Sequence, residues 1–216
     1  MTVKKIFWQD PYQTQVDTIV MSVNGNHITL AETIFYAFAG GQERDYGTIA
    51  GYPVLDAHKE GLEIIYTLPD EHTLQVGDAV HVEIDWERRY ALMRLHFAAE
   101  IVLEVVTQDY GIEKIGAHIA QDKSRIDFLH NESIKPLLPD ITHRANQLIV
   151  ANHPITSAFS HELSERRYWM IDGFAKVACG GTHPKTTGEV GKIRLKRKNT
   201  GKGKERIEIY LANVSV

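Results

Sequence analysis

The sequence has one cysteine in 216 residues and no apolar run close to the roughly 20 residues that a membrane-spanning helix needs. Because Cys179 has no second cysteine to pair with, no disulfide can form within the chain. The N-terminal residues turn polar at Gln9 and Asp10 and lack the apolar segment of a secretory signal. These absences exclude a disulfide scaffold and a helical membrane protein, and they lead us to expect a cytoplasmic location.

The composition is that of an ordinary globular protein, with 43% hydrophobic and 24% charged residues, and the length suits one large or two small domains. A net charge of −4 argues against general attraction to nucleic acid, but the charge is uneven. Eight basic residues and one acidic residue lie between Lys192 and Arg206. Such a strip suits contact with a phosphate backbone, and it equally suits a solvated hairpin whose lysines protect an edge strand.

The first 85 residues carry short β-strand patterns separated by turn residues. Asn24-Gly25-Asn26 has the chemistry of a hairpin turn. Short strands at this spacing are typical of a small barrel or a compact antiparallel sheet. The expected strands are Thr14–Val23, His27–Ala31, Gly47–Leu55, a segment from His58, Leu62–Tyr66 and Ala79–Ile84.

After Asp85, which is a suitable N-cap, the pattern becomes helical from Trp86 to about Val106, with one apolar face. Mixed α and β signals follow. We therefore predict an α+β fold, with a small β-barrel-like domain over residues 1–85 and an α/β two-layer domain with an antiparallel sheet over residues 86–216. Within the second domain we expect strands at Arg125–His130, Ile155–Glu162 and Tyr168–Ile171, a helix at Ile141–Ala151 capped by Asp140, and a final hairpin of Lys192–Leu195 and Arg206–Leu211.

Two short motifs combine residue types that bind zinc. His96 and Glu100 lie four residues apart on the predicted helix, so their side chains project from the same side. Cys179 and His183 flank Gly180-Gly181-Thr182, where glycines allow the sharp turn that lets thiolate and imidazole converge. One thiolate, two imidazoles and one carboxylate form a donor set that tetrahedral zinc accepts.

Each of these residues also has an ordinary interpretation when taken alone. His96 fits a hydrogen-bonded core histidine, Glu100 fits a solvated helix carboxylate, and Cys179 fits a small buried hydrophobe or a reactive thiol. Two other histidines, His118 and His130, fit structural or exposed positions better than catalytic ones. The presence of both motifs in one chain favours the zinc interpretation over these alternatives.

The two motifs resemble those of the AlaX family, the free-standing relatives of the alanyl-tRNA synthetase editing domain. That family holds zinc with a helical His-x-x-x-His and a later Cys-x-x-x-His. Here His96, Cys179 and His183 match three of the four positions, the last two within Cys-Gly-Gly-Thr-His. Glu100 stands where the family has its second histidine, so the resemblance implies one zinc ion per chain, with a carboxylate in its coordination shell.

Other segments extend the resemblance over most of the chain. Gly40-Gly41-Gln42 is similar to the glycine-rich segment of the longer, two-domain members, and Gln121 stands where the synthetase editing site has a glutamine near its substrate. The resemblance implies catalytic roles for these four residues, although a plain turn and a surface glutamine are the alternatives. Ala99 replaces a threonine that the family uses to recognise the hydroxyl of serine.

The segment that contains Lys202, Lys204 and Arg206 resembles the family's terminal hairpin, and we expect these residues, with Ala99 and Gln121, to bind substrate. The resemblance implies hydrolysis of mischarged alanine tRNA, which releases serine or glycine. The implied partner is the aminoacylated acceptor end of tRNA. Four protein ligands close the coordination shell of zinc and leave no position for a water molecule. We therefore expect zinc to orient the substrate rather than to generate a bound hydroxide. Two alternatives stay open: a tRNA-binding or zinc-structural module without catalysis, and a hydrolase of another small aminoacyl ester. The oligomeric state, monomer or dimer, is also left open.

Overall fold

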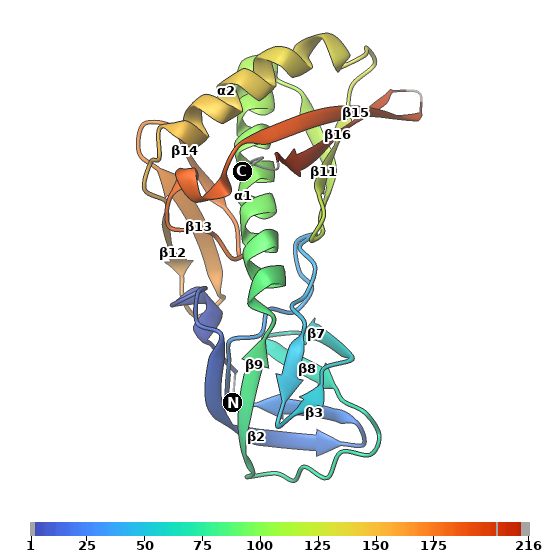
Figure 1. Ribbon diagram of the computed structural model, residues 1–216, viewed down its shortest axis with the longest axis vertical. Helices are drawn as coiled ribbons and strands as arrows, with labels where there is room; N and C mark the ends of the chain where they lie inside the picture. Colours follow the sequence, from blue (N-terminus) through green and yellow to red (C-terminus); the bar gives the residue numbers. More distant parts are fainter. Residues whose placement is uncertain (1–2, 202, 213–216) are drawn as a thin grey trace. The chain divides into compact units, whose positions relative to one another are not determined.

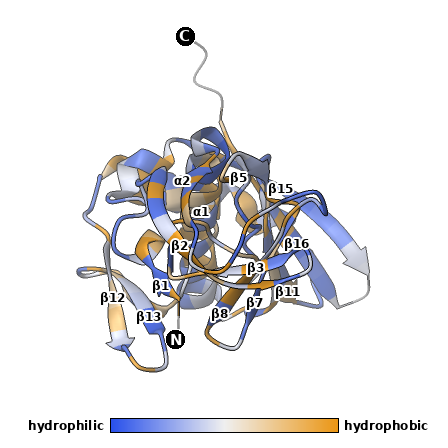
Figure 2. Ribbon diagram, turned by 90° about the horizontal axis from the view of Figure 1, so that it is seen from below, coloured by the Kyte–Doolittle hydropathy of each residue, from blue (hydrophilic) through white to orange (hydrophobic). Residues whose placement is uncertain are grey.

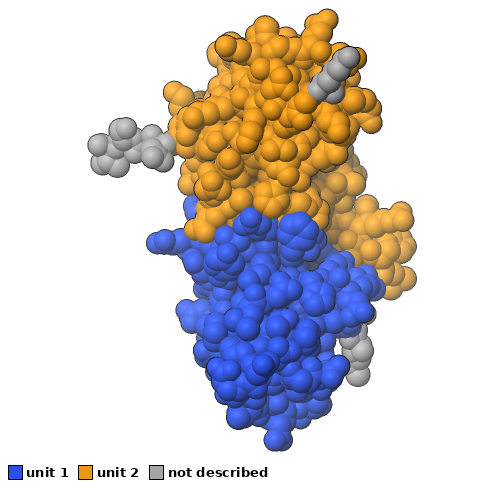
Figure 3. Space-filling model, turned by 90° about the vertical axis from the view of Figure 1, so that its right-hand side faces the viewer, with its two compact units in different colours: residues 1–39, 43–90 blue, residues 40–42, 91–216 orange. Residues whose placement is uncertain are grey.

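The computed structural model describes residues 3–201 and 203–212. The chain divides into two compact units, which Figure 3 colours blue and orange. Unit 1 comprises Met1–Ala39 and Glu43–Tyr90, and unit 2 comprises Gly40–Gln42 and Ala91–Val216. Helix α1 (Trp86–Tyr110) begins in unit 1 and continues into unit 2. The three residues Gly40–Gln42 therefore belong to unit 2, although unit 1 precedes and follows them in the sequence.

Unit 1 is a curled, antiparallel seven-stranded sheet, as the β-rich pattern predicts, with strand order β6-β5-β9-β2-β3-β8-β7. Alternate residues of β9, namely Val80, Val82 and Ile84, are buried in the unit's own apolar core. One expected strand, Gly47–Leu55, is instead two short strands, because the backbone turns at Gly51 with φ +81°. The elements of unit 1 are β1 (Lys4–Lys5), η1 (Ile6–Trp8), β2 (Gln15–Asn24), β3 (His27–Leu30), β4 (Glu32–Thr33), β5 (Gly47–Ile49), β6 (Tyr52–Pro53), β7 (Asp56–Glu60), β8 (Glu63–Thr67) and β9 (Ala79–Ile84).

Unit 2 contains two antiparallel sheets, of order β10-β11-β16-β15 and β12-β13-β14, together with most of α1 and the shorter helix α2. Its core joins apolar residues of α1 and α2 to residues of both sheets, and Figure 1 shows α1 passing among these elements. The α+β prediction is therefore confirmed. The elements are β10 (Glu113–Ile119), β11 (Ser124–Leu129), η2 (Lys135–Leu137), α2 (Leu138–Val150), β12 (Thr156–His161), β13 (Arg166–Ile171), β14 (Ala175–Ala178), η3 (Thr187–Val190), β15 (Ile193–Gly201) and β16 (Lys204–Leu211).

Helix α1 begins at the predicted N-cap, since the Arg88 N–H donates to Asp85 Oδ1 at 3.0 Å. It extends one turn beyond the predicted end and stops at Tyr110, where Gly111 has φ +63°. The sequence predicted one apolar face, but the middle of the helix is buried more widely. Both Met93 and Phe97 are fully buried. They lie outside the apolar face predicted from the three- and four-residue spacing of Leu92, Leu95, Ala99, Val102, Leu103 and Val106. Neither helix, within the described residues, is long and apolar enough to cross a membrane.

Helix α2 starts before its predicted boundary, so the prediction that Asp140 caps it is wrong. Leu137 occupies the N-cap position, and Asp140 lies in the first turn. Pro139 is compatible with this start because the first helical turn has no internal partner for its missing N–H. The Asp140 carboxylate instead accepts a hydrogen bond from the Tyr110 hydroxyl at 2.6 Å, which ties α2 to the end of α1.

Candidate metal centre

The candidate site starts on α1, where His96 and Glu100 face the same direction, as predicted. The His96 Nε2 atom lies 3.2 Å from Glu100 Oε1. His96 is buried, and the Glu100 side chain is mostly buried. The other Glu100 oxygen, Oε2, accepts a hydrogen bond from the indole Nε1 of fully buried Trp169 at 3.0 Å. The carboxylate is therefore held between β13 and α1, and the solvated interpretation of Glu100 is wrong.

The Cys179–His183 segment reaches His96 directly after β14. Its first residue is held to β13 by a hydrogen bond from Cys179 N–H to Arg167 O of 3.0 Å. Gly181 then passes so close to α1 that a Cβ added there would lie 1.9 Å from His96 Cε1. The close approach places Cys179 Sγ 3.4 Å from His96 Nε2. Glycine is required at position 181 because no side chain fits between the turn and the imidazole.

The two imidazoles and the thiol form one cluster. The ligand atoms of His96, Cys179 and His183 all lie within 4.8 Å of one another. The His183 Nε2 atom is buried and has no hydrogen-bond partner among the described residues, which is unusual for a polar atom and leaves its lone pair available to a metal. The donor types, the spacing and the unpartnered nitrogen together fit a zinc-type metal ion.

Each imidazole is oriented through its other nitrogen. The His96 Nδ1–H group donates to Gln42 Oε1 at 2.6 Å, and the Gln42 amide donates to Thr182 Oγ1 at 2.9 Å. His183 Nδ1 is hydrogen-bonded to Ser157 Oγ at 3.0 Å. Both Nε2 atoms are therefore directed toward the cluster, an arrangement that metal-binding histidines commonly have.

The charges of the cluster are strongly coupled. Burial lowers the pKa of His96, but interactions with Cys179 and the Glu100 carboxylate outweigh burial and raise it to about 10. Burial raises the pKa of Glu100, but the hydrogen bond and charge of His96 outweigh burial and lower it to about 2. The pKa of His183 falls to about 3 because it is buried and lies beside positively charged His96. His183 is therefore neutral and has a lone pair available for a metal.

Gln42 joins the cluster because the glycine-rich segment packs onto β10. The Ile119 N–H donates to Gly41 O at 2.8 Å, and a Cβ at Gly41 would lie 2.7 Å from Ala117 O. Gly41 also has φ +87°, a conformation that glycine adopts readily. Gly40 precedes it with φ +60° and is exposed. The segment thus carries the buried Gln42 side chain to His96.

The remaining predicted site residues lie elsewhere in unit 2. Ala99 lies on α1 and is buried in the core, and Gln121 is exposed in the turn between β10 and β11. Arg206 donates to Asp127 at 2.5 and 3.0 Å, so its guanidinium is already paired. Lys204 is exposed at the start of β16, and Lys202 lies outside the described residues.

Three site residues were missed by sequence reasoning. Ser157 and Trp169 come from strands whose sequence has no distinctive motif, and Thr182 lies within Cys-Gly-Gly-Thr-His but has no ligand atom for zinc. Their roles depend on which distant residues they face. Of the three, only Thr182 had a usable signal, namely its place in the motif.

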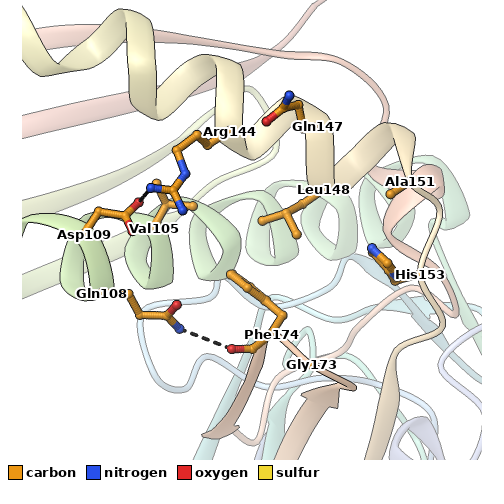
Figure 4. A pocket seen from close by; sticks show the side chains of 10 residues that line it. All are labelled: Val105, Gln108, Asp109, Arg144, Gln147, Leu148, Ala151, His153, Gly173 and Phe174. Atoms are coloured by element: carbon orange, nitrogen blue, oxygen red, sulfur yellow. Dashed lines mark hydrogen bonds and ion pairs between the residues drawn. The ribbon is translucent and has the colours of Figure 1, made fainter.

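Unit 2 also has a cavity of about 450 Å³ that is separate from the cluster. Figure 4 shows it between α1, α2 and the turn after β13, with Val105, Leu148 and Phe174 among its lining residues. Its charged groups, Asp109 and Arg144, form an ion pair with each other. None of the predicted metal ligands lines this cavity, so it does not extend the candidate site.

Comparison with known proteins places the chain among tRNA synthetase and editing proteins. Residues 170–208, which include Cys179 and His183, match the family model described as the threonyl and alanyl tRNA synthetase second additional domain. The chain is 30% identical over 225 residues to an alanine–tRNA ligase of Methanococcus maripaludis, covering 94% of this chain and 25% of the ligase. The chain is therefore a homologue of about one quarter of that enzyme.

Two relatives match over nearly their whole length. The chain is 32% identical over 213 residues to the alanyl-tRNA editing protein AlaX-M of Pyrococcus horikoshii, covering 96% of this chain and 97% of the relative. It is 30% identical over 243 residues to AlaX-M of Methanosarcina acetivorans, covering 95% and 98%. The chain belongs to the AlaX-M family of alanyl-tRNA editing proteins.

Proposed function

We propose that this protein is an aminoacyl-tRNA deacylase that removes serine or glycine from mischarged alanine tRNA, using a zinc ion held by His96, Glu100, Cys179 and His183. The observation that carries the proposal is the convergence of two imidazoles and a thiol within 4.8 Å. Family membership supports the editing role, since the relatives are named alanyl-tRNA editing proteins. The zinc ligands are inferred from the site, and the amino acid removed is what the family resemblance implies.

Distances at His96 support Glu100 as the fourth ligand. Donor atoms bound at about 2.0 to 2.3 Å to one tetrahedral zinc lie about 3.3 to 3.6 Å from each other. From His96 Nε2, Glu100 Oε1 lies at 3.2 Å and Cys179 Sγ at 3.4 Å. Both separations are close to the expected edge. Glu100 is not among the three side chains whose ligand atoms all lie within 4.8 Å of one another, so its carboxylate would have to move to share one ion with Cys179 and His183.

Bound zinc would supply a fixed positive charge that orients polar groups of the substrate. Because four protein ligands close its shell, direct coordination of a substrate atom would require one ligand to leave or the shell to expand. Around it, Gln42 acts as a positioning residue, because its amide group is occupied by His96 and Thr182. Ser157 positions His183 in the same way. Glu100 makes the ligand shell one charge more negative than a shell with three histidines, which weakens the attraction for an oxyanion.

For substrate contacts we propose the groups near the glycine-rich segment and the β10–β11 turn. Gly40 offers an exposed backbone next to Gly41, and Gln121 offers an exposed side-chain amide two residues after Ile119. Ala99 lacks the hydroxyl that would recognise serine, so serine selectivity would depend on other groups. Water is the nucleophile for the aminoacyl ester. The protein holds the ester in the orientation that allows this attack.

A second candidate function is a tRNA-binding module without catalysis. It is favoured by the raised pKa of His96, because an imidazolium whose Nε2 lies 3.2 Å from Glu100 Oε1 and 3.4 Å from Cys179 Sγ can hydrogen-bond within the cluster without a metal. In that case a proton occupies the position that zinc would take. The substitution Glu100→His would then create zinc binding and produce a large gain in deacylation.

The experiment that tests the proposal measures metal content and deacylation on the same sample, using alanine tRNA charged with serine, glycine or alanine, with and without a chelator. We expect about one zinc per chain and release of the wrong amino acid that stops after chelation. Cys179→Ser should lower both values, whereas His143→Ala, on the exposed face of α2, should change neither. Folded, zinc-loaded protein that releases no amino acid from any of these tRNAs would overturn the proposal.

A further inference from the structure

The outward face of the β15–β16 hairpin carries a regular row of basic side chains. Along β15, Arg194, Lys196 and Lys198 alternate with residues that face the core, and all three are exposed, as is Lys192 just before the strand. On β16 the outward residues are Lys204, Arg206, Glu208 and Tyr210. Figure 2 colours the hairpin largely as hydrophilic. We call this surface the basic row, defined as Lys192, Arg194, Lys196 and Lys198.

The basic row differs from its neighbours in that its cations form no close ion pair, although Lys198 is near enough to Glu208 to help lower the pKa of that carboxyl. Arg206 is paired with Asp127, and Lys123 is paired with Glu208 at 2.9 Å. No member of the basic row forms an ion pair among the described residues of the chain. Four cations without a close ion pair, along and just before the edge strand of a sheet in a protein of net charge −4, form a localised positive surface.

The aromatic ring of Tyr210 contacts several basic side chains at one end of this surface. Tyr210 lies opposite Arg194 in the strand register, and the Arg194 guanidinium lies 4.2 Å from the ring centroid. The Lys196 and Lys123 ammonium groups lie 5.4 and 5.8 Å from the same ring. These cation–π contacts restrict long side chains before any partner binds, which reduces the entropy lost on binding.

The row is continuous with the candidate site through the sheet. In the strand register, Ile119 pairs with Ser124 and Ser124 pairs with Ile209, the neighbour of Tyr210. Ile119 also holds Gly41, and the next residue, Gln42, contacts His96. The Tyr210 end of the sheet is therefore the end where the glycine-rich segment is attached, and the row runs from there toward Lys198.

We infer that the basic row and Tyr210 bind the phosphate backbone of the double-helical acceptor arm of tRNA, while the unpaired 3′ end enters the metal site. Alternate residues on a strand lie about 6.7 Å apart, similar to the distance between successive phosphates of one nucleic acid strand. Backbone contacts of this kind position an RNA helix without reading its sequence. The inference rests on the proposed function for the identity of the RNA. The sequence predicted that Lys204 and Arg206 bind the tRNA substrate. We now assign the main contact with tRNA to the basic row instead.

The test compares Arg194→Gln/Lys196→Gln with a control of equal charge change, Lys135→Gln/Lys176→Gln. The control is matched because Lys176 lies over an aromatic ring as well, 4.1 Å from the Tyr168 centroid, but in the β12-β13-β14 sheet. Binding of uncharged alanine tRNA is measured over a series of salt concentrations. We expect the first variant to bind at least tenfold more weakly, with the log–log salt slope reduced by about one per cation removed, and the control to bind normally.

A ring variant and a short substrate separate this inference from the proposed function. Tyr210→Leu should weaken tRNA binding severalfold at unchanged charge, whereas Tyr210→Phe should retain it. Hydrolysis of a mischarged 3′-terminal trinucleotide, which lacks the acceptor helix, should be equal in all variants. Loss of tRNA binding by the row variant supports the inference even if no substrate is hydrolysed. Unchanged tRNA affinity and salt slope would overturn it while leaving the editing activity intact.

The same variants test the ordinary explanation of an edge-strand lysine row, which is protection against strand pairing between molecules. If that were its only role, Arg194→Gln/Lys196→Gln would self-associate in sedimentation analysis and still bind tRNA with normal affinity. That outcome would also overturn the inference. A monodisperse variant with weakened tRNA binding is the result that we expect.

Discussion

At the scale of single residues, Gly181 decides whether the two halves of the candidate site can meet. The turn that carries it passes against the His96 imidazole, where a Cβ would lie 1.9 Å from Cε1. Its neighbour Gly180 has no such constraint, because a Cβ there would meet nothing within 4 Å. The two adjacent glycines therefore differ. A side chain at position 181 would clash with His96, whereas a side chain at position 180 would meet no neighbouring atom.

We expect Gly181→Ala to displace either the turn or His96 and to abolish metal binding, with a loss of about 1–3 kcal/mol in the free energy of unfolding. Gly180→Ala is the matched control and should bind metal normally. Metal content after dialysis and urea denaturation measure the two effects. Equal metal content in the two variants would contradict the close packing at position 181.

Ser157 is a second residue whose importance follows from one contact, the hydrogen bond of 3.0 Å to His183 Nδ1. We expect Ser157→Ala to lower zinc affinity about 10- to 100-fold, because an unsupported imidazole loses its orientation and basicity. Ser160, on the same strand, bonds to the Arg166 backbone instead, so Ser160→Ala should leave the affinity unchanged. Competition with a chelating dye measures both values. A Ser157→Ala variant with normal affinity would mean that packing alone orients His183.

At the scale of elements, the β15–β16 hairpin is held on its inner side by one carboxylate. Glu205 accepts hydrogen bonds from the Arg197 guanidinium at 2.5 and 2.6 Å and from the Ile134 N–H at 3.2 Å. The hydrogen bond from Arg197 lowers the pKa of Glu205 below its ordinary value. The same hairpin thus has an ion-paired inner side and an outer side whose basic row forms no close ion pair.

The lowered pKa of Glu205 predicts how stability depends on pH. A carboxyl group with a depressed folded-state pKa contributes stability that is complete above its unfolded pKa of about 4.3 and is lost as the pH falls through the folded value. We expect Glu205→Gln to lower the free energy of unfolding by about 1–3 kcal/mol at pH 7, and by progressively less below pH 4. Glu132→Gln, at an exposed position, is the control. Urea denaturation at several pH values checks this, and a difference that does not change with pH would exclude the ion pair as its source.

At the scale of the whole molecule, each unit has its own apolar core and its own buried polar centre. In unit 1 the fully buried pair of Arg89 and Asp45 serves this purpose, and Arg89 also donates to Ile34 O at 2.6 Å. In unit 2 the corresponding centre is the His96 cluster. Removing either centre should therefore affect different parts of the chain.

We expect Asp45→Asn to leave Arg89 as a buried charge with a weakened partner and to destabilise unit 1 by about 3–5 kcal/mol. Zinc should instead slow amide hydrogen exchange in the segments of unit 2 around residues 96 and 179. Hydrogen-exchange mass spectrometry with and without zinc, on the native protein and on Asp45→Asn, resolves the two effects. Zinc protection confined to unit 1 peptides would contradict the placement of the site.

Much of the local structure could be predicted because its causes are local. The Asp85 cap, the strand Ala79–Ile84 and the shared direction of His96 and Glu100 follow from capping chemistry and from the periods of strand and helix. Asp140 was misassigned as the cap of α2 because it is a good capping residue and follows Pro139. The local pattern alone could not show that the helix begins earlier, at Leu138. The burial of Met93 and Phe97, in addition to the predicted apolar face, results from the number of elements that pack around α1, and the helical period does not reveal this number.

By itself, the sequence determined the residue types available to a zinc-type site and the turns and helix that present them, because spacing and backbone chemistry act over a few residues. Only the tertiary structure decided which groups lie around them: Gln42 and Ser157 behind the imidazoles, Trp169 behind Glu100, and Asp127 beside Arg206. These partners are separated by 26 to 79 residues in the chain. Their contacts are set by packing of the whole core, which no local period encodes.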